Sequence, residues 1–294
     1  MSAHPGSASF RKKIEYFLSV TLRLNPLFYR RIVKTKPKRP YFLIGMIREK
    51  DESLILQDTL DHVAKFVDGI IVYDDASTDD SVKIALTHPA VLQVIVNKRW
   101  KKSGRIWEET YSRKLLLNTA KRYKPEWLFY FDADERFEGD IRPFLEKECP
   151  SDINAIRISL FDAYITKDDR EPYKKGGKLL DLRKYFGPEK RDILMLWRNV
   201  AKADYTRPDA REPQGFTTKE MLTRFYCQHY GKAQSIEHWE ATCRYYANFF
   251  PKYSEKWRAR MGKAVHSESD FGQKLYTWAE VKRHAVPLES IVKK

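Results

Sequence analysis

Cysteine is scarce in this sequence, and long apolar runs are missing. The 294 residues include three cysteines, Cys149, Cys227 and Cys243, and none lies in a CxxC pattern or at a Cys/His spacing suited to structural zinc. No run approaches the roughly 18 apolar residues of a membrane span, and no secretory signal pattern opens the chain. These absences exclude a structural zinc site of the usual spacing. They predict a reduced, cytoplasmic protein that is soluble or peripheral to a membrane.

Acidic residues are fewer than basic ones. Lys and Arg number 55 and Asp and Glu 40, which gives a formal net charge of +15. Such a field attracts phosphates, nucleic acids or anionic lipid headgroups and does not choose between them. Hydrophobic residues make up 42% and aromatic residues 14%, which is enough apolar material for the core of one large domain.

The first 40 residues differ from the rest. Between Phe10 and Val33 apolar side chains are mixed with Arg and Lys in a basic amphipathic pattern, and 34–40 (KTKPKRP) has the composition of a linker. A helix in the first segment either packs its apolar stripe on the parent domain or lies on an anionic membrane surface. We expect packing, with peripheral membrane contact as the alternative.

From Tyr41 onward, continuous apolar runs alternate with segments of helical periodicity. Such runs are typical of strands that are covered on both faces. This β-α-β-α order predicts an α/β fold with a mostly parallel, doubly wound sheet, and ligands bind at the carboxyl ends of the strands in such sheets. Strands are expected at 41–47, 69–73, 91–96 and 127–131, and helices at 52–66, 79–86 and 106–122.

The alternation weakens beyond Asp134. A long polar stretch at 166–190 is expected to be functional or mobile. Further strands are expected at 155–160, 193–197 and 222–229, and aromatic-rich helices at 236–250 and 253–265.

A first acidic cluster, Asp74-Asp75, follows the apolar run at 70–73. A carboxylate beside a buried strand is costly unless it finds a partner. The following residues can simply turn the chain and cap the next helix, with Ser77, Thr78 or Asp79 as the N-cap. Capping does not need two carboxylates at the strand end, so we also expect Asp74 or Asp75 to contact nucleobase or ribose donors of a ligand.

A second acidic cluster, Asp132-Ala133-Asp134, follows the apolar run Trp127–Phe131. Two carboxylates one residue apart at a strand end can converge on Mg²⁺ or Mn²⁺, which take oxygen ligands and keep positions free for phosphate. The sequence therefore predicts a cation–diphosphate site here.

These clusters lie in three stretches that resemble the family 2 glycosyltransferases of GT-A fold. The resemblance covers roughly 41–138. It departs from the family pattern at Lys50-Asp51, where Asn-Glu is frequent, and at Ala76, where Gly is usual. The matching stretches are MIREKDE (46–52), IIVYDDASTD (70–79) and WLFYFDADE (127–135).

The resemblance implies a Rossmann-like sheet and a nucleoside-diphosphate sugar as donor, with Mn²⁺ or Mg²⁺ bridging its diphosphate. It implies a catalytic domain at 41–232 with a nucleotide-binding half (41–138) and an acceptor half (139–232), before a helical C-terminal appendage (233–294). It also implies metal ligation by Asp132 and Asp134. The residues it places near the donor are Ile47, Arg48, Glu49, Asp74, Asp75, Arg113, Asp132 and Ala133.

Two further residues match family positions. Arg113 either pairs with the acidic cluster or the diphosphate, or is a solvated helix charge. His229 resembles the late histidine that completes the metal shell in some GT-A enzymes, although a lone histidine is more often an ordinary core or surface residue.

The family transfers sugar with inversion, which needs a general base for the acceptor hydroxyl. The candidates are Asp162 and Asp192, with Glu212 as a weaker one, and each could instead form a surface ion pair. Arginines 191, 198, 207 and 211 either close over the diphosphate or form a solvated basic face. Aromatic residues Trp197, Trp239, Tyr245 and Tyr246 either stack on sugars or belong to the core.

The expected function is transfer of a sugar to a glycan or lipid-linked acceptor, as in polysaccharide biosynthesis. A sugar nucleotidyltransferase is the alternative, but 44–47 is not the Gly-rich, Lys-containing loop that such chemistry normally uses. A nucleic-acid-binding protein is a further alternative. Two strand-end acidic clusters would repel a phosphate backbone, so we expect no nucleic-acid partner.

Overall fold

The computed structural model describes residues 28–36, 40–100, 105–208 and 210–292. Most of the amphipathic segment between Phe10 and Val33 lies outside these ranges. Its end, Tyr29–Val33, is a strand, β1, instead of a helix, and it pairs antiparallel with β4 (Val91–Asn97). Within the described ranges, no helix is both long and apolar enough to cross a bilayer.

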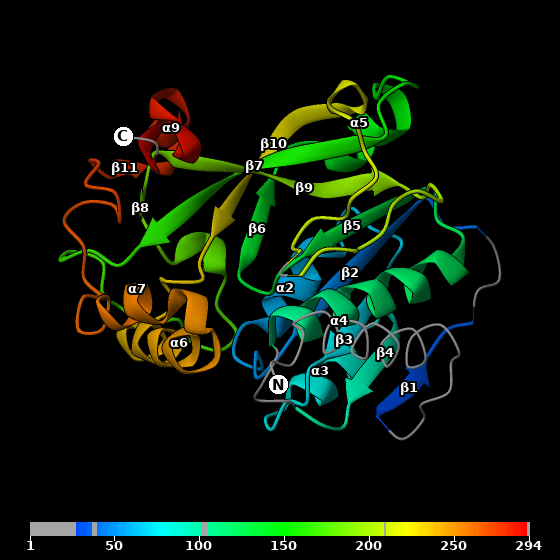
Figure 1. Cartoon of the computed structure of the whole chain (residues 1–294), viewed down its shortest axis with the longest axis horizontal. Helices are drawn as coiled ribbons and strands as arrows, with labels where there is room; N and C mark the ends of the chain where they lie inside the picture. The colour runs from blue at the N-terminus through cyan, green and yellow to red at the C-terminus, as the bar shows by residue number, and fades with distance from the viewer. Residues whose placement is uncertain (1–27, 37–39, 101–104, 209, 293–294) are drawn as a thin grey trace, which may run out of the picture.

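Four parallel strands form the first half of the sheet in the order β4-β3-β2-β5 (Figure 1). The expected strands and helices of this half are confirmed, so the carboxyl ends of these strands meet at one edge. Besides β4 the elements are β2 (Leu43–Glu49), α2 (Leu56–Val63), β3 (Gly69–Asp74), α3 (Ser81–Thr87), α4 (Arg105–Ala120) and β5 (Trp127–Phe131).

The second half of the sheet is mixed. Strand β9 (Glu189–Arg198) runs antiparallel to both β5 and β7 (Ala155–Tyr164), and β10 (Met221–His229) runs parallel to β7. Strand β6 (Glu135–Glu138) closes the order by pairing antiparallel with β10. The α/β fold class is confirmed, and the antiparallel pairs are concentrated in this half.

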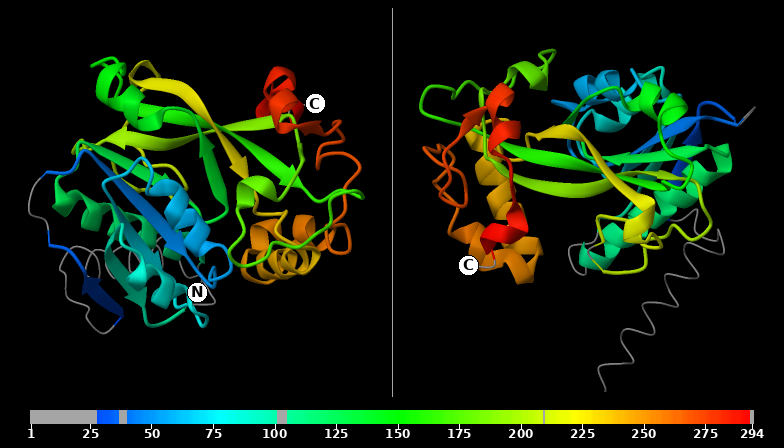
Figure 2. Two further views of the ribbon diagram at one scale, coloured as in Figure 1. Left: turned by 180° about the vertical axis from the view of Figure 1, so that it is seen from behind. Right: turned by 90° about the horizontal axis from the view of Figure 1, so that it is seen from above.

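The C-terminal region contains short strands as well as helices. The helix expected at 253–265 is only a short one, α7 (Ser254–Arg258), and it lies beside α6 (Ile236–Phe249). Strand β11 (Tyr276–Thr277) pairs with β8 (Tyr185–Phe186), and β12 (Val286–Pro287) pairs with β9. Figure 2 shows this region, in orange and red, at the end of the molecule away from the parallel half. The remaining helices are α5 (Ile141–Lys147), α8 (Trp278–Val281) and α9 (Leu288–Val292).

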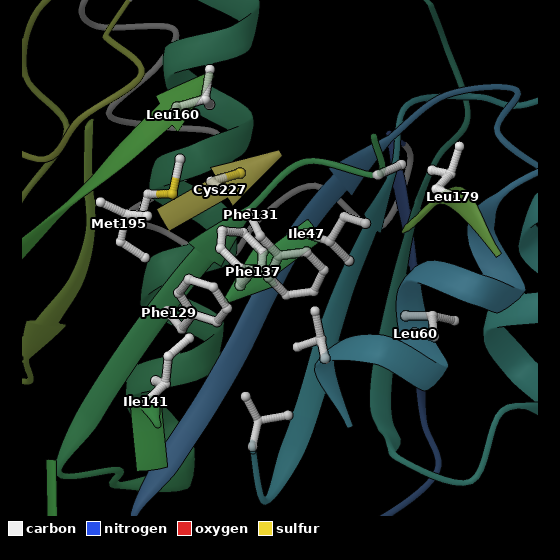
Figure 3. Packing of buried hydrophobic residues seen from close by; sticks show 14 of the residues in the cluster. Ile47, Leu60, Phe129, Phe131, Phe137, Ile141, Leu160, Leu179, Met195 and Cys227 are labelled. Atoms are coloured by element: carbon white, nitrogen blue, oxygen red, sulfur yellow. The ribbon is translucent and has the colours of Figure 1, made fainter. Parts of the chain in front are cut away.

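Helices cover both faces of the parallel half because alternate strand residues point to opposite sides. On one face Phe129 and Phe131 of β5 pack with Leu60 of α2 and Ile141 of α5 (Figure 3). On the other face Tyr130, Ile44 and Met46 pack against the leucines of α4. Burial of each large side chain contributes roughly 1.5–3 kcal/mol. This packing buries every residue of β5, and β5 leads directly into the acidic motif.

His62 of α2 makes the stability of this core depend on pH. Its Nε2 accepts the backbone N–H of Phe137 at 2.8 Å, and burial followed by the charge of Arg136 lowers its pKa from 6.5 to about 4. Between these values the unfolded chain binds a proton that the folded protein does not, so stability falls as the pH drops below 6.5. At 1.36 kcal/mol per pKa unit the loss near pH 5 is about 2 kcal/mol.

Replacing His62 with Gln keeps an acceptor for Phe137 but removes the titration. We therefore expect the free energy of unfolding to drop by about 2 kcal/mol less between pH 7 and pH 5 in His62→Gln than in the wild type. Urea unfolding at both pH values measures this difference. Equal drops in the two proteins would show that His62 does not carry the effect.

Candidate functional site

A cleft of about 740 Å³ opens at the carboxyl ends of β2 and β5. Its other walls come from β7, β9, the end of β10, and helices α6 and α7. Predicted site residues from both halves of the chain line it, among them Glu49, Asp132, Asp134, Asp162 and His229. The fold therefore brings the second acidic cluster together with a histidine that lies far away in the sequence.

Asp132 is the first residue after the buried strand β5. Its carboxylate pairs with Arg211, which lies on the segment between β9 and β10, and its backbone N–H donates to Glu135 Oε2 at 2.9 Å. Arg211 also pairs with the fully buried Glu135. One guanidinium therefore pairs with two carboxylates at the acidic motif.

Asp134 faces His229 across the cleft wall, with 3.4 Å between Asp134 Oδ2 and His229 Nε2. Its second oxygen, Oδ1, is buried and has no hydrogen-bond partner. Burial by itself raises the pKa of Asp134, but the charges of His229 and Arg211 outweigh it and lower the pKa to about 2. A Cβ on Gly231 would lie 2.6 Å from Asp134 Oδ2, so only glycine leaves room for this carboxylate.

Asp162 holds the other side of the imidazole, with 2.6 Å between its Oδ1 and His229 Nδ1. It also pairs with Arg191 and, at 2.9 Å, with Lys232. Burial opposes ionisation of Asp162, but these cations dominate and hold its pKa well below the usual range. Burial alone would lower the pKa of His229, yet Asp134 and Asp162 raise it to about 9. The Nε2 atom is thereby directed at Asp134.

The donor set suits a hard divalent cation. Carboxylate oxygens, as in Asp132 and Asp134, are ligands that Mn²⁺ and Mg²⁺ accept, whereas an imidazole nitrogen suits the transition metal Mn²⁺ better than Mg²⁺. Burial and the nearby Asp134 and Asp132 raise the pKa of Glu52 as well, which marks a concentration of negative potential. Among the residues that the structure describes, no group of three or more His, Cys, Asp or Glu side chains is arranged closely enough to hold a metal ion. The unpartnered Oδ1 of Asp134 is the atom that a cation would satisfy.

Asp74 and Asp75 do not line the cleft, and both are buried. Asp75 accepts hydrogen bonds from Arg48 at 2.8 Å and Asn97 at 2.9 Å, and it pairs with Arg105. Burial and then Asp74 raise the pKa of Glu49 well above the usual range, as expected of two adjoining carboxyl groups. Their neighbours Arg48 and Glu49 do line the cleft. Direct contact between a nucleoside and Asp74 or Asp75 stays a prediction.

The structure also locates Ile47 and Ala133, two residues that the resemblance assigns to the donor site. Ile47 is a fully buried core residue, whereas Ala133 lines the cleft. Ala76 has a φ of 61°, the left-handed region that favours glycine, so the turn persists at a cost of roughly 1–2 kcal/mol. Helix α3 begins after Asp80, and Asp79 accepts the N–H of Ser81 at 2.9 Å.

Arg113 lines the cleft but does not pair with the acidic motif. It donates to Tyr130 Oη at 3.1 Å and to the carbonyl of Ala210 at 3.2 Å, and so joins α4 to the segment that carries Arg211.

Of the three predicted bases, only Asp162 lines the cleft. Asp192 does not, because it pairs with Lys190 at 2.9 Å and accepts a bond from Ser159. Glu212 forms an ion pair with Arg157 at 2.9 Å.

The remaining predicted groups divide between cleft and core. Arg191 and Arg211 line the cleft, whereas Arg198 pairs with Glu126 at 2.7 Å. Likewise Tyr245 and Tyr246 line the cleft, and the two tryptophans of that set, 197 and 239, are fully buried.

Several lining residues were not predicted. Lys232 lies three residues after the expected strand 222–229, and its position near a strand end could have marked it as a candidate site residue. Glu52 belongs to the matching stretch 46–52, so it also had a local signal. Tertiary packing brings in the others from segments that no local pattern marks: Glu109, Glu189, Lys256, Arg260 and Asp270.

Sequence relatives include a glycosyltransferase. The chain is 37% identical over 133 residues to an uncharacterized protein of Mycobacterium tuberculosis, covering 44% of this chain and 31% of that protein. It is 32% identical over 97 residues to an uncharacterized glycosyltransferase of Rickettsia prowazekii, covering 33% and 29%. The chain thus spans about a third of the length of these relatives. No family model matches.

Solved structures overlap with the chain to a limited extent. A mannosyltransferase from Pyrobaculum calidifontis, in complex with GDP-Man and Mn²⁺, is 15% identical over 88% of this chain and 74% of that one, with a TM-score of 0.34. Glucosyl-3-phosphoglycerate synthase of Mycobacterium tuberculosis, with Mn²⁺ and UDP, is 15% identical over 45% and 52%, with a TM-score of 0.29. Structural similarity at this low TM-score does not establish an activity, so the activity is argued from the residues of the site. The expected resemblance to glycosyltransferases is confirmed by the Rickettsia relative.

Proposed function

We propose that this protein is a metal-dependent glycosyltransferase that moves a sugar from a nucleoside-diphosphate sugar to an acceptor hydroxyl. The observation that carries the proposal is the ionised Asp134 beside Asp132, with one buried oxygen that has no partner. Leaving a buried carboxylate oxygen without a hydrogen-bond partner is costly. A cation between these carboxylates would remove that cost and bind the diphosphate of a donor.

We assign Asp132 and Asp134 as ligands of Mn²⁺ or Mg²⁺ and His229 Nε2 as a further ligand. Asp162 orients the imidazole through Nδ1, as carboxylates commonly do for metal-binding histidines. The bound ion supplies Lewis-acid stabilisation of the leaving nucleoside diphosphate. Arg113 and Arg211 are the nearby cleft cations for the diphosphate, and Arg48 with Glu49 faces the nucleoside.

Inversion requires a carboxylate that accepts the proton of the acceptor hydroxyl. Asp162 is poorly suited because its ion pairs hold its pKa well below the usual range. Glu189 also lines the cleft, burial raises its pKa, and it accepts a hydrogen bond from Ser269. A raised pKa brings a base closer to the operating pH, so we favour Glu189 as the base.

A thermal-shift panel tests the proposal. The full chain is heated with UDP- and GDP-linked sugars, with and without Mn²⁺. A ligand at 100 times its Kd stabilises the native state by about 2.7 kcal/mol, so at least one donor should raise Tm, and only when Mn²⁺ is present. Pyrophosphate release from a nucleoside triphosphate would instead identify a nucleotidyltransferase. A panel without any Mn²⁺-dependent shift would contradict the proposal.

We also propose that the acceptor is a glycan or a lipid-linked sugar, as in polysaccharide biosynthesis. The basic character of the chain supports such an acceptor at an anionic membrane surface, and the segment before Val33 is the candidate for peripheral contact.

A further inference from the structure

Four cations from three segments of the chain gather at the α7 side of the cleft. We call them the cationic corner. Two carboxylates lie among them: Asp162, which pairs with two of the four, and Asp270, which is 2.5 Å from Lys232 and 2.7 Å from Arg260. Four positive and two negative charges leave a surplus of two, and Glu189 beside them lowers it to one when ionised. The members of the cationic corner are Arg191, Lys232, Lys256 and Arg260.

Lys256 carries the surplus. No carboxylate of the described residues forms an ion pair with it, and its side chain is exposed to the cleft. Burial and then Arg260 and Lys232 lower its pKa, as expected where like charges crowd together. Holding an unpaired ammonium beside other cations is unfavourable in the free protein. An anionic ligand would relieve the repulsion.

The cationic corner is separate from the half of the cleft that suits the donor. Nucleosides bind at the carboxyl ends of the parallel strands, which here are β2, β3, β4 and β5. The corner belongs instead to β9, to the residues after β10, and to α7 with the turn that follows it, and His229 lies between Asp162 and Asp134. A group bound there would be next to the metal site on the side left for the acceptor.

An aromatic face adjoins the cationic corner. Tyr246 and Trp257 stack with ring centroids 4.7 Å apart, and the guanidinium of Arg260 lies 4.9 Å from the Trp257 ring. Both aromatic residues line the cleft. Aromatic faces provide large apolar surfaces against which the C–H face of a sugar can pack.

We propose that the cationic corner binds an acidic group of the acceptor, a phosphate ester or a carboxylate, so that the acceptor is an acidic sugar or a sugar phosphate. This inference rests on the proposed function, because it presupposes that the cleft also holds a sugar donor. Phosphate and carboxylate make the same charge-assisted hydrogen bonds to Lys and Arg. Glucose 6-phosphate and glucuronate therefore serve as separate probes, with glucose as the neutral control.

Isothermal titration of the full chain at low salt measures the binding of these three probes. We expect the wild type to bind at least one acidic probe and not glucose. Lys256→Gln should weaken that binding about tenfold, the ratio that corresponds to about 1.4 kcal/mol for one charge-assisted contact. Lys256→Arg should restore it. Lys263→Gln is the matched control, because Lys263 is exposed, lies outside the cleft lining and carries the same charge.

Binding of UDP and GDP with Mn²⁺, measured on the same proteins, separates the two proposals. Lys256→Gln should leave it unchanged, and Asp134→Asn should abolish it while preserving the binding of the acidic probe. The inference is overturned if the wild type binds neither acidic probe, or if Lys256→Gln binds an acidic probe as tightly as the wild type does. It is also overturned if Lys256→Gln weakens the binding of the nucleotide instead of the acidic probe. Failure of nucleotide binding in the wild type would contradict the proposed function, whereas Lys256-dependent binding of the acidic probe would still show that the cationic corner is an anion site.

Discussion

Asp134→Asn is expected to lower Mn²⁺-dependent turnover of a nucleotide-sugar donor on the order of a thousandfold, the size of effect seen when a key electrostatic group is removed. The amide keeps the shape of the side chain but not its charge, and the buried Oδ1 can no longer ligate a cation strongly. The attraction to His229 is also lost, so a modest fall in Tm should accompany the change. Steady-state kinetics over a Mn²⁺ titration, with circular dichroism as a check of folding, measures both effects.

Asp152→Asn is the matched control for this experiment, because Asp152 is exposed and lies outside the cleft lining. It alters the net charge equally and should leave turnover and metal dependence unchanged. If Asp134→Asn kept wild-type turnover and the same Mn²⁺ requirement, the assignment of Asp134 as a metal ligand would be wrong.

The second large effect concerns stability. Arg136→Met is expected to lower the free energy of unfolding by about 3–5 kcal/mol, the range for removing one partner of a buried ion pair. Arg136 is 1% exposed, and its Nη2 lies 2.7 Å from Asp58 Oδ2. It also donates to the carbonyls of Ala133 at 3.1 Å and Glu135 at 2.7 Å. Methionine would remove the Arg136 donors from all three acceptors; Ala133 would keep the hydrogen bond from Thr59 of α2, and Asp58 would keep the N–H of Leu179.

Urea unfolding measures this loss, and Arg170→Met, at an exposed position, is the control. A double-mutant cycle isolates the ion pair: Asp58→Asn should cost clearly less in the Arg136→Met background than in the wild type. Asp58 also accepts the N–H of Leu179 at 3.0 Å, so it keeps a structural role in both backgrounds. A loss below 1 kcal/mol for Arg136→Met would contradict a dominant role for this side chain.

The parallel half of the fold could be predicted because its strands are apolar on both faces. Each strand is therefore a continuous apolar run that can be recognised from a few neighbouring residues. Strands β1 and β6 could not be predicted in this way. β1 (YRRIV) lies at the sheet edge with its arginines exposed, so its composition matches a basic amphipathic segment. β6 (ERFE) buries Glu135 and Arg136, which only their ion pairs make tolerable, and those partners come from other parts of the chain.

The candidate site divides in the same way. The pair Asp132 and Asp134 is local, so a short motif indicated it, whereas Arg211 contacts Asp132 from 79 positions away. Asp192 does not line the cleft, because successive strand residues point to opposite faces. On β9 its neighbour Arg191 reaches the cleft, and Asp192 turns to Ser159 and Lys190. Sequence periodicity located the strand but not which of its faces met the cleft.

Arg211 gives the acidic motif a tethered competitor for any divalent ion. Because its guanidinium already pairs with Asp132 and Glu135, a bare ion must displace it from Asp132 and leave it with Glu135 alone. An ion that arrives together with a diphosphate supplies a replacement partner, so each ligand strengthens the binding of the other. In the proposed enzyme, uptake of metal and nucleotide is therefore synergistic, and Arg211 keeps a partner for Asp132 in the metal-free protein between turnovers.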